Sequence, residues 1–271
     1  MREARLTPGD SQARLEHNMN RQEKIADIRH FLARYGLPSE RPALCLGVAA
    51  ADRALGGGLH TGALHEVYAE DWGAAGFAAC LAIKAAGPKP LFWIRPDYES
   101  LEYGALEPQG LAELGGHPEN LFLIKTANAA EALSAASDIL ACPHVGALVL
   151  EISGQPKALD MVAGRRLNFI ASESGVTPIL LREGAEALPS AALTRWHISS
   201  APSDGDDWGM PSFKAELARN RLGPTGSWRL TWDPDNGFFH EPARIQYAPH
   251  PGAMAATAFD RPAQKERRFA F

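Results

Sequence analysis

The sequence contains little cysteine, no long apolar run and no marked excess of charge of either sign. Its 271 residues include 3 cysteines, Cys45, Cys80 and Cys142, and no two of them form a CxxC pair. A structural zinc site or a disulfide framework is therefore not expected, and we expect free, buried thiols in a reducing compartment. The formal net charge of −5 argues against a protein whose whole surface attracts nucleic acid.

Signals for secretion and for membrane insertion are also lacking. The polar N-terminal segment has no apolar stretch of the kind found in secretory signals. No other stretch approaches the roughly 20 apolar residues that span a bilayer. We therefore expect a cytoplasmic protein without membrane contact. The hydrophobic fraction of 45% and the charged fraction of 22% suit one α/β domain with appendages, or at most two small domains.

The middle of the chain alternates strand-like and helix-like segments. Short apolar runs bounded by turn residues are typical of buried parallel strands, and they occur at residues 62–69, 90–95, 121–125, 145–152 and 177–181. Helical spacing of apolar residues occurs at 72–86, 128–140 and 159–171. Asn128 and Glu131 form a capping box at the start of the second helix. This order predicts βαβ units and a mainly parallel sheet.

The pattern then changes to strands without intervening helices. The strand-like runs are 193–199, 213–221, 227–233 and 237–240. They predict an antiparallel ribbon that closes one edge of the sheet. The predicted organisation is a flexible arm at 1–20, an N-terminal helix and linker at 21–42, a core domain at 43–245 and a disordered tail at 246–271.

The loop after the first predicted strand lacks the residues of a phosphate-binding loop. In a parallel α/β protein this junction is the natural anion site, and a P-loop would read G-x-x-x-x-G-K-[ST]. No lysine or arginine lies between Arg53 and Lys84, and no serine or threonine lies between Thr61 and Ser100. The residues at the junction are Ala69, Glu70, Asp71, Trp72, Gly73, Ala74, Ala75 and Gly76.

The same junction carries negative charge. Unless their side chains point away, Glu70 and Asp71 would each repel a phosphate at about 5 Å by roughly 3 kcal/mol at an effective dielectric of about 20. The missing lysine costs roughly another 1.5–3 kcal/mol. Asp71 could instead cap the following helix, at the place that a phosphate would take. We therefore predict no productive ATP binding, and we assign no cofactor, metal or catalytic residue.

The segment before this loop resembles the corresponding segment of RecA-like recombinases. In that family a leucine-glycine-glycine-leucine turn and a further glycine precede a strand that ends in glutamate, a hydrophobic residue and tyrosine. Residues 55–59, Gly62 and residues 66–68 match this pattern. Downstream, Glu151 ends a strand that looks like the Walker B strand, and Asp97 lies near the position of the family's catalytic glutamate. The resemblance implies a RecA-like core in which both acids are vestigial; from the residues alone, a structural role for Glu151 and a solvated Asp97 are favoured.

Other functional elements of that family are missing as well. The segments 153–157 and 183–190, which correspond to its DNA-binding loops, are long enough only for short turns. Arg182 stands where the family has a glutamine that senses ATP. The nucleotide elements and the DNA elements are therefore degenerate together.

Together with the sequence of residues 219–233, these features resemble those of the ImuA family of bacteria. The members of this family are RecA-like accessory proteins related to SulA. The resemblance covers about residues 21–242. It implies a non-catalytic role in damage-inducible translesion synthesis, the mutagenic part of the SOS response. The partners that it implies are ImuB, which is an inactive relative of Y-family polymerases, an error-prone replicative-type DNA polymerase, and RecA.

Three sets of residues are candidate contacts to partners or to DNA. Arg219, Arg221 and Arg229 alternate with tryptophans on the predicted ribbon and could bind single-stranded DNA weakly, although tryptophans in the core and arginines outside are favoured. A second set is a narrow helical stripe that consists of Ile25, Ile28 and Leu32. Docking of this stripe on the protein's own core is favoured over docking on a partner. The end of the chain resembles a short binding peptide and contains Arg267, Arg268, Phe269 and Phe271.

Two other functions stay open at this point. A SulA-like inhibitor of cell division that binds FtsZ would share the degenerate core. A weak RecA-like ATPase or DNA-binding protein with a nonstandard site ranks third, because the loop chemistry is missing.

Overall fold

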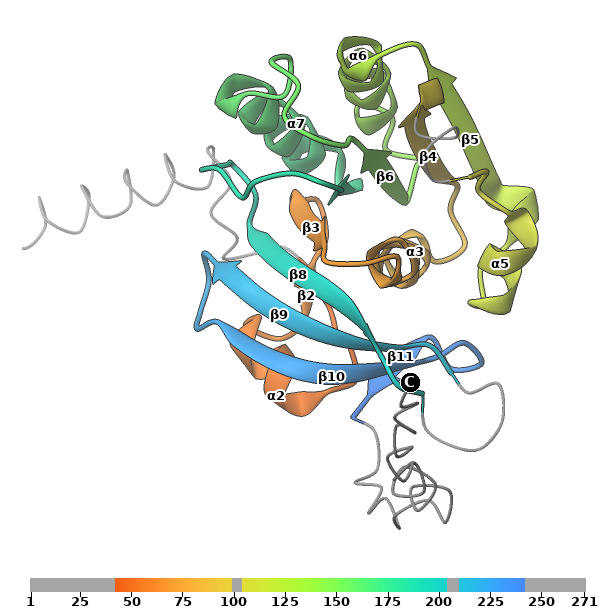
Figure 1. Ribbon diagram of the computed structural model, residues 1–271, viewed down its shortest axis with the longest axis vertical. Helices are drawn as coiled ribbons and strands as arrows, with labels where there is room; N and C mark the ends of the chain where they lie inside the picture. Colours follow the sequence, from red (N-terminus) through yellow and green to blue (C-terminus); the bar gives the residue numbers. More distant parts are fainter. Residues whose placement is uncertain (1–41, 99–103, 204–209, 242–271) are drawn as a thin grey trace, which may run out of the picture.

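The described residues of the computed structural model are 42–98, 104–203 and 210–241. The predicted arm at 1–20, the predicted helix at 21–35 and the tail at 246–271 lie outside them, and so do Ile25, Ile28, Leu32, Arg267, Arg268, Phe269 and Phe271. The described residues form a nine-stranded sheet with helices on both faces (Figure 1). This architecture confirms the predicted fold class, an α/β protein with a mainly parallel sheet and a C-terminal antiparallel ribbon.

Six neighbouring strands of the sheet run parallel to one another. In spatial order they are β5 (Leu121–Thr126), β4 (Leu91–Pro96), β6 (Ala147–Glu151), β7 (Thr177–Arg182), β3 (His65–Ala69) and β8 (Thr194–Ala201). The antiparallel ribbon continues the sheet with β9 (Ser212–Asn220), β10 (Gly226–Asp233) and β11 (Phe238–His240). The strands fall within two or three residues of the predicted ones.

Three long helices cover the two faces of the sheet. Helix α3 (Gly73–Ala86) packs on one face, and α6 (Ala129–Leu140) and α7 (Met161–Ser174) pack on the other. Asn128 caps α6 by accepting hydrogen bonds from the backbone amides of Ala130 and Glu131, and Glu131 bonds back to Ala127. The predicted cap at Asn128 is confirmed, but the return bond differs from a standard capping box, because Glu131 Oε2 accepts from the backbone N–H of Ala127, one residue before the cap.

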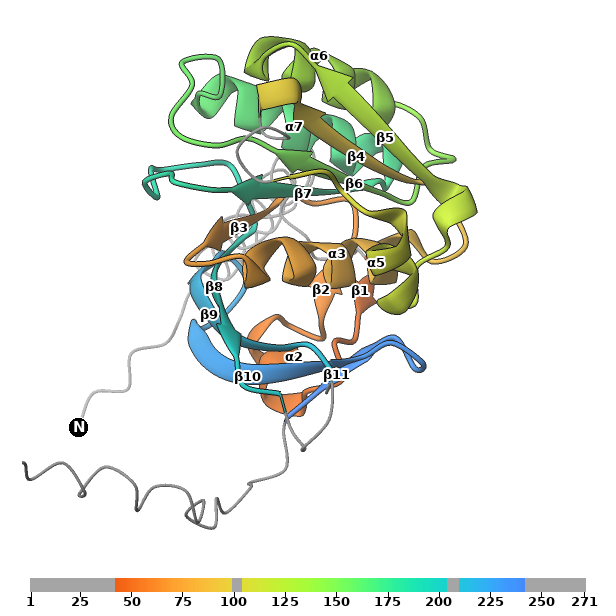
Figure 2. The same ribbon diagram turned by 45° about the vertical axis from the view of Figure 1, so that its right-hand side comes forward.

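The antiparallel ribbon curls around α3, which places this helix inside the molecule (Figure 2). Phe77, near the start of α3, contacts three aromatic rings at centroid distances of 5.5–5.7 Å, and they belong to Trp196 of β8, Phe213 of β9 and Phe239 of β11. Burial of such aromatic side chains is a large stabilising contribution. The start of α3 is consequently fixed against β8 and β9.

Several short elements were not predicted from the sequence. A two-stranded hairpin, β1 (Ala43–Leu44) with β2 (Leu59–His60), encloses α2 (Ala49–Ala54), and α5 (Pro108–Glu113) precedes a 3-10 helix (Pro118–Asn120). The predicted strand at 62–69 was too long, because residues 62–64 form a turn in which Gly62 has a φ of +63°. The expectation of buried thiols was wrong for Cys45 and Cys142, which are exposed, and right for Cys80.

Candidate functional site

The junction between β3 and α3 is filled by the chain's own carboxylate. Asp71 Oδ1 accepts a hydrogen bond from the backbone N–H of Gly73, the first residue of α3, at 2.8 Å. The same carboxylate accepts bonds from the Ser200 backbone N–H at 2.8–2.9 Å and from its hydroxyl at 3.0 Å. A helix N-terminus stabilises negative charge, and Asp71 places a carboxylate at this end of α3.

The loop around Asp71 also packs closely against β8. A Cβ atom at Gly73 would lie 2.6 Å from Ser200 Oγ and 3.0 Å from the Ser200 backbone nitrogen, so this contact favours glycine. The Glu70 backbone N–H donates to the carbonyl of Ile198, and Glu70 Oε1 lies 3.0 Å from His197 Nδ1. Both acids of the loop are therefore directed to the neighbouring strand.

A hollow of about 140 Å³ lies beside this junction. It is lined by Ala69, Glu70, Asp71, Trp72, Glu183 and Gly184. Ligand pockets measure about 300–1,000 Å³, and three of the lining side chains are carboxylic acids. The hollow is small and acidic, which disfavours the binding of a nucleoside triphosphate.

Substitution of Asp71 by asparagine is expected to lower the thermal stability slightly, and only above about pH 4. Burial raises the pKa of Asp71, but the hydrogen bonds from Ser200 and Gly73 together lower it by more, so the pKa lies below the usual value. A carboxylate with a lowered pKa in the folded state stabilises the fold above its unfolded pKa, and this contribution disappears as the pH falls through the folded pKa. Since the side chain is exposed to screening solvent, the effect is at most about 1 kcal/mol. Melting temperatures of the wild type and Asp71→Asn should differ at about pH 7 and converge toward about pH 3; an equal difference at both would contradict this assignment.

Glu151, the vestigial Walker B acid of the sequence analysis, lies in a buried ion pair. Its carboxylate accepts hydrogen bonds from Arg95 at 2.8 Å and from the indole N–H of Trp93 at 2.9 Å. The side chains of Glu151 and Arg95 are each 5% exposed. Asp97 is exposed and lies just beyond the end of β4. The structure does not bring Asp97 and Glu151 together by any observed contact.

Arg182 links the two segments that correspond to DNA-binding loops. Its guanidinium donates to the carbonyls of Ile152 and Gly154 and to the side chain of Gln155. The Gly154 N–H donates to the carbonyl of Glu183 at 2.8 Å, and the Gln155 amide donates to that of Glu186 at 2.6 Å. The segments 153–157 and 183–190 are therefore joined to each other by hydrogen bonds.

A second buried ion pair connects β3 and β8. Arg195 donates to Glu66 at 2.9 Å and to the carbonyls of Ala187 and Leu188. The guanidinium also lies 5.1 Å from the ring centroid of Tyr68. Burial, and then the charge of Glu66, raise the pKa of the Tyr68 phenol. This pair fixes the loop before β8 and was not identified from the sequence.

The structure separates the three arginines predicted to share one surface. Arg219 and Arg221 lie at the end of β9 and both donate to the carbonyl of Ser190, at 3.0 and 3.1 Å. Arg229, on β10, is opposite Lys214 in the strand register, and Lys214 precedes Arg219 by five residues along β9. The Arg229 guanidinium donates to the carbonyl of Pro202. The tryptophans between them are packed: Trp232 is fully buried and Trp228 packs against Trp196. Trp232 is therefore not available as a stacking platform for bases, whereas Trp228 is only partly buried.

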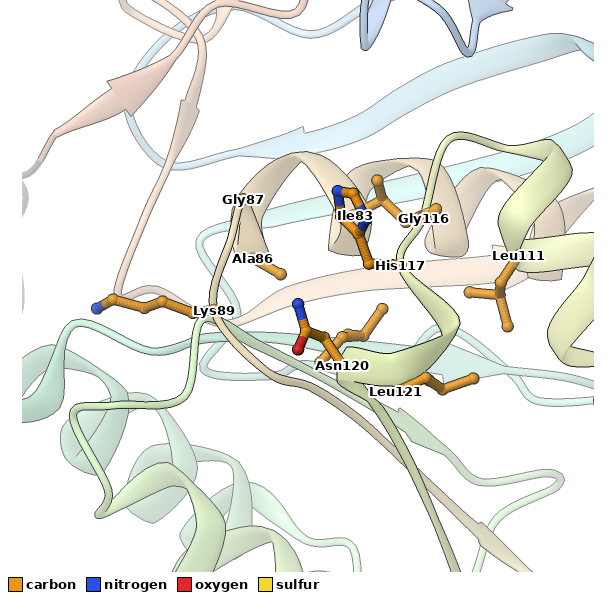
Figure 3. Close-up of a pocket in the computed structure, with 10 residues that line it drawn as sticks. Ile83, Ala86, Gly87, Lys89, Leu111, Gly116, His117, Asn120 and Leu121 are labelled. Carbon is orange, nitrogen blue, oxygen red and sulfur yellow. The ribbon is translucent and has the colours of Figure 1, made fainter.

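A further hollow of the core lies among apolar residues that include Ile83, Leu91 and Leu111. This hollow, drawn in Figure 3, between the end of α3 and the 3-10 helix, measures about 20 Å³ and is large enough only for a water molecule. Within 42–98, 104–203 and 210–241, no group of three or more His, Cys, Asp and Glu residues is arranged to hold a metal ion. No helix in the same ranges is long and apolar enough to cross a bilayer.

Sequence comparison gives the family of the chain. The protein ImuA of Caulobacter vibrioides strain NA1000 / CB15N is 30% identical over 177 residues, which cover 59% of this chain and 67% of that relative. The chain belongs to the ImuA family. The protein ImuA of the Caulobacter vibrioides strain ATCC 19089 / CIP 103742 / CB 15 matches to the same extent, and no family model matches. For this ImuA family member, the comparison confirms the resemblance found in the sequence.

Proposed function

We propose that this ImuA family member is a non-catalytic accessory protein of damage-inducible translesion synthesis. In this role it connects ImuB and an error-prone replicative-type polymerase with RecA in the cytoplasm. The observation that carries the proposal is the position of the Asp71 carboxylate at the start of α3, where a nucleotide phosphate would be bound. A RecA-like core that has lost its nucleotide site acts through its surfaces.

The surroundings of the junction support the same proposal. Glu70, Asp71 and Glu183 surround a hollow too small for a nucleotide, and no lysine is close in sequence. Glu151 is neutralised by Arg95 inside the core, so the residue expected beside magnesium already has a partner. Arg182 stands where the resemblance implies a nucleotide sensor. It joins the two short loops at the positions where the resemblance implies DNA-binding loops.

The purified full-length chain is expected to retain purified ImuB, and also RecA, in a capture assay. Removal of the first 36 residues or of the last 20 tests the stripe of Ile25, Ile28 and Leu32 and the tail that ends in Phe271. Loss of a contact that buries such anchors should reduce retention by about tenfold or more, since anchors contribute at least 2 kcal/mol. A matched control carries Lys125→Glu and Lys214→Glu on exposed strand positions. If the full-length chain retains neither protein, the proposal is wrong.

The two alternative functions, division inhibitor and residual ATPase, are each expected to give a different experimental result. A SulA-like division inhibitor would produce filamentous cells on overexpression and block FtsZ assembly in solution. A residual ATPase would bind ATP below millimolar concentration in calorimetry. Either result, together with a failure to retain ImuB and RecA, would replace the proposed function.

A further inference from the structure

Helix α7 exposes a stripe of apolar and basic side chains on the face turned away from the sheet. Val162, Arg165, Arg166 and Phe169 follow one another at the i, i+3, i+4 and i+7 positions that share one helix face. Val162 is 70% exposed and Phe169 is 51% exposed. The opposite face of the helix is buried and consists of Gly164, Leu167 and Ala171. Such a large exposed apolar pair on one helix face favours an interaction surface.

Two more arginines extend this stripe from a distant part of the sequence. Arg219 and Arg221, at the end of β9, are held next to α7 by their bonds to the carbonyl of Ser190. A hollow of about 580 Å³ lies between the helix and this strand end, and it is lined by Val162, Arg165, Arg166, Asn168, Phe169, Ala191 and Arg221. We refer to Val162, Arg165, Arg166, Phe169, Arg219 and Arg221 as the α7 surface. Helix α7 itself lies on the face of the sheet opposite α3 (Figure 1).

The positive charge of the α7 surface is not compensated within the described part of the chain. None of its four arginines forms an ion pair with a described carboxylate. Burial is the largest cause of the lowered pKa of Arg221; the charges of Arg219 and Arg165 lower it further, and the charge of Glu66 raises it. An anionic ligand would relieve the repulsion between these arginines, and the flanking Val162 and Phe169 require that the ligand also has apolar groups.

The chain's own terminal segments do not have this chemistry. In residues 1–41 and in residues 242–271, basic residues outnumber acidic ones. The acidic run at 204–207 joins β8 to the start of β9, whereas Arg219 and Arg221 are at the other end of that strand. The charge complement is therefore expected from another molecule.

The composition of the α7 surface favours a protein over a nucleic acid. Single-stranded nucleic acid is bound by several aromatic platforms beside a basic groove, whereas this surface has one aromatic residue, Phe169, and an aliphatic one, Val162. Arginine and aromatic residues are enriched at protein interfaces. The hollow beside α7 is lined by both apolar side chains of the surface and by three of its arginines. A hydrophobic groove that holds the apolar face of a helix is a recurrent mode of peptide recognition.

We infer that the α7 surface binds an acidic amphipathic helix of a partner protein. The apolar face of that helix would lie against Val162 and Phe169, and its carboxylates would pair with the four arginines. This inference rests on the proposed function only in assuming that the protein acts by binding other proteins.

A synthetic peptide of this chemistry tests the inference without ImuB. The probe is a helical peptide of about 16 residues with leucines at i, i+3, i+4 and i+7 and glutamates beside them; a second peptide has lysines in place of the glutamates. Fluorescence anisotropy measures binding to the full-length chain, to Arg165→Glu/Arg166→Glu, to Val162→Ser/Phe169→Ser and to the control Lys125→Glu/Lys214→Glu. Circular dichroism and thermal unfolding verify that each variant is folded.

We expect the acidic peptide to bind the wild type and the control variant equally. Both α7 variants should bind it about tenfold more weakly or worse, because a lost charge pair or a lost anchor each changes affinity by at least this factor. The lysine peptide should not bind. The inference is overturned if the acidic peptide does not bind the wild type, or binds the folded α7 variants equally well.

Two further results would also overturn it. A dT20 oligonucleotide that binds through Arg165 and Arg166 more tightly than the peptide would identify a nucleic-acid surface. Self-association of the wild type that is lost in the α7 variants would identify a second copy as the occupant. None of these outcomes affects the capture of ImuB or RecA, so the inference and the proposed function can fail separately.

Discussion

Replacement of Glu151 by alanine is expected to lower the free energy of unfolding by about 3–5 kcal/mol. The substitution leaves the guanidinium of Arg95 buried without its carboxylate, and it also removes the acceptor of the Trp93 indole N–H. Removal of one partner from a buried ion pair costs more than the pair contributes, since the remaining charge is desolvated and uncompensated. At about 2–4 °C per kcal/mol for a domain of this size, the melting temperature should fall by roughly 6–20 °C. Thermal and urea unfolding of both proteins give the measurement.

A double substitution provides the control for this prediction. In Arg95→Met/Glu151→Leu both charges are absent and apolar groups of similar volume fill the space, so most of the stability should return. A loss below about 1 kcal/mol in Glu151→Ala would be typical of an exposed pair, and would show that the carboxylate is not held by Arg95. Recovery in the double variant would show that the destabilisation comes from the unpaired charge of Arg95.

The same pair accounts for the burial of an acid at the end of β6. Glu151 ends β6, and Arg95 lies near the end of the neighbouring β4, where Ile94 pairs with Leu150. A buried carboxylate requires a compensating charge, and here that charge belongs to the protein itself. The stability of the fold is therefore expected to depend on this acid.

Much of the parallel core could be predicted from the sequence because each strand is a short apolar run with its own turn signals. The runs at 90–95, 121–125 and 177–181 agree with β4, β5 and β7 within a residue or two. Strands such as β4 and β7, which are buried on both faces, require apolar residues on both faces, and that requirement is readable without tertiary information. The helices α3, α6 and α7 were predicted for the same reason, from their apolar spacing. The expected burial of 121–125 was wrong, because β5 is the edge strand of the sheet and exposes Phe122 and Leu123.

The contacts between distant segments could not be predicted in this way. Glu66 and Arg195 are paired across β3 and β8, and nothing in either local segment indicates the other. Arg165 and Arg221 meet only because α7 and the end of β9 lie beside the same loop. Sequence patterns give the faces of single elements, whereas charge partners depend on register and on which elements are neighbours.

The glycine-rich turn that carries the resemblance to recombinases has a structural use of its own. Gly56, Gly57 and Gly58 have φ values of +76°, +119° and +133°, and they connect α2 to β2. Gly58 is buried and faces the backbone of β1, whereas Gly57 is exposed. The packing of the hairpin alone therefore accounts for glycine at position 58.

Gly58→Ala is therefore expected to destabilise the fold by about 4 kcal/mol, which combines backbone strain with overpacking. Its new Cβ would lie 2.2 Å from the carbonyl oxygen of Leu44, and a backbone atom of the paired strand cannot move away cheaply. Gly57→Ala is the matched control: it imposes a similar positive φ, but its Cβ would meet only Ala43 Cβ at 3.9 Å. We expect this control to lose about 1–2 kcal/mol from strain alone. Urea unfolding of the two variants separates the terms, and equal losses would show that the hairpin does not restrict residue 58.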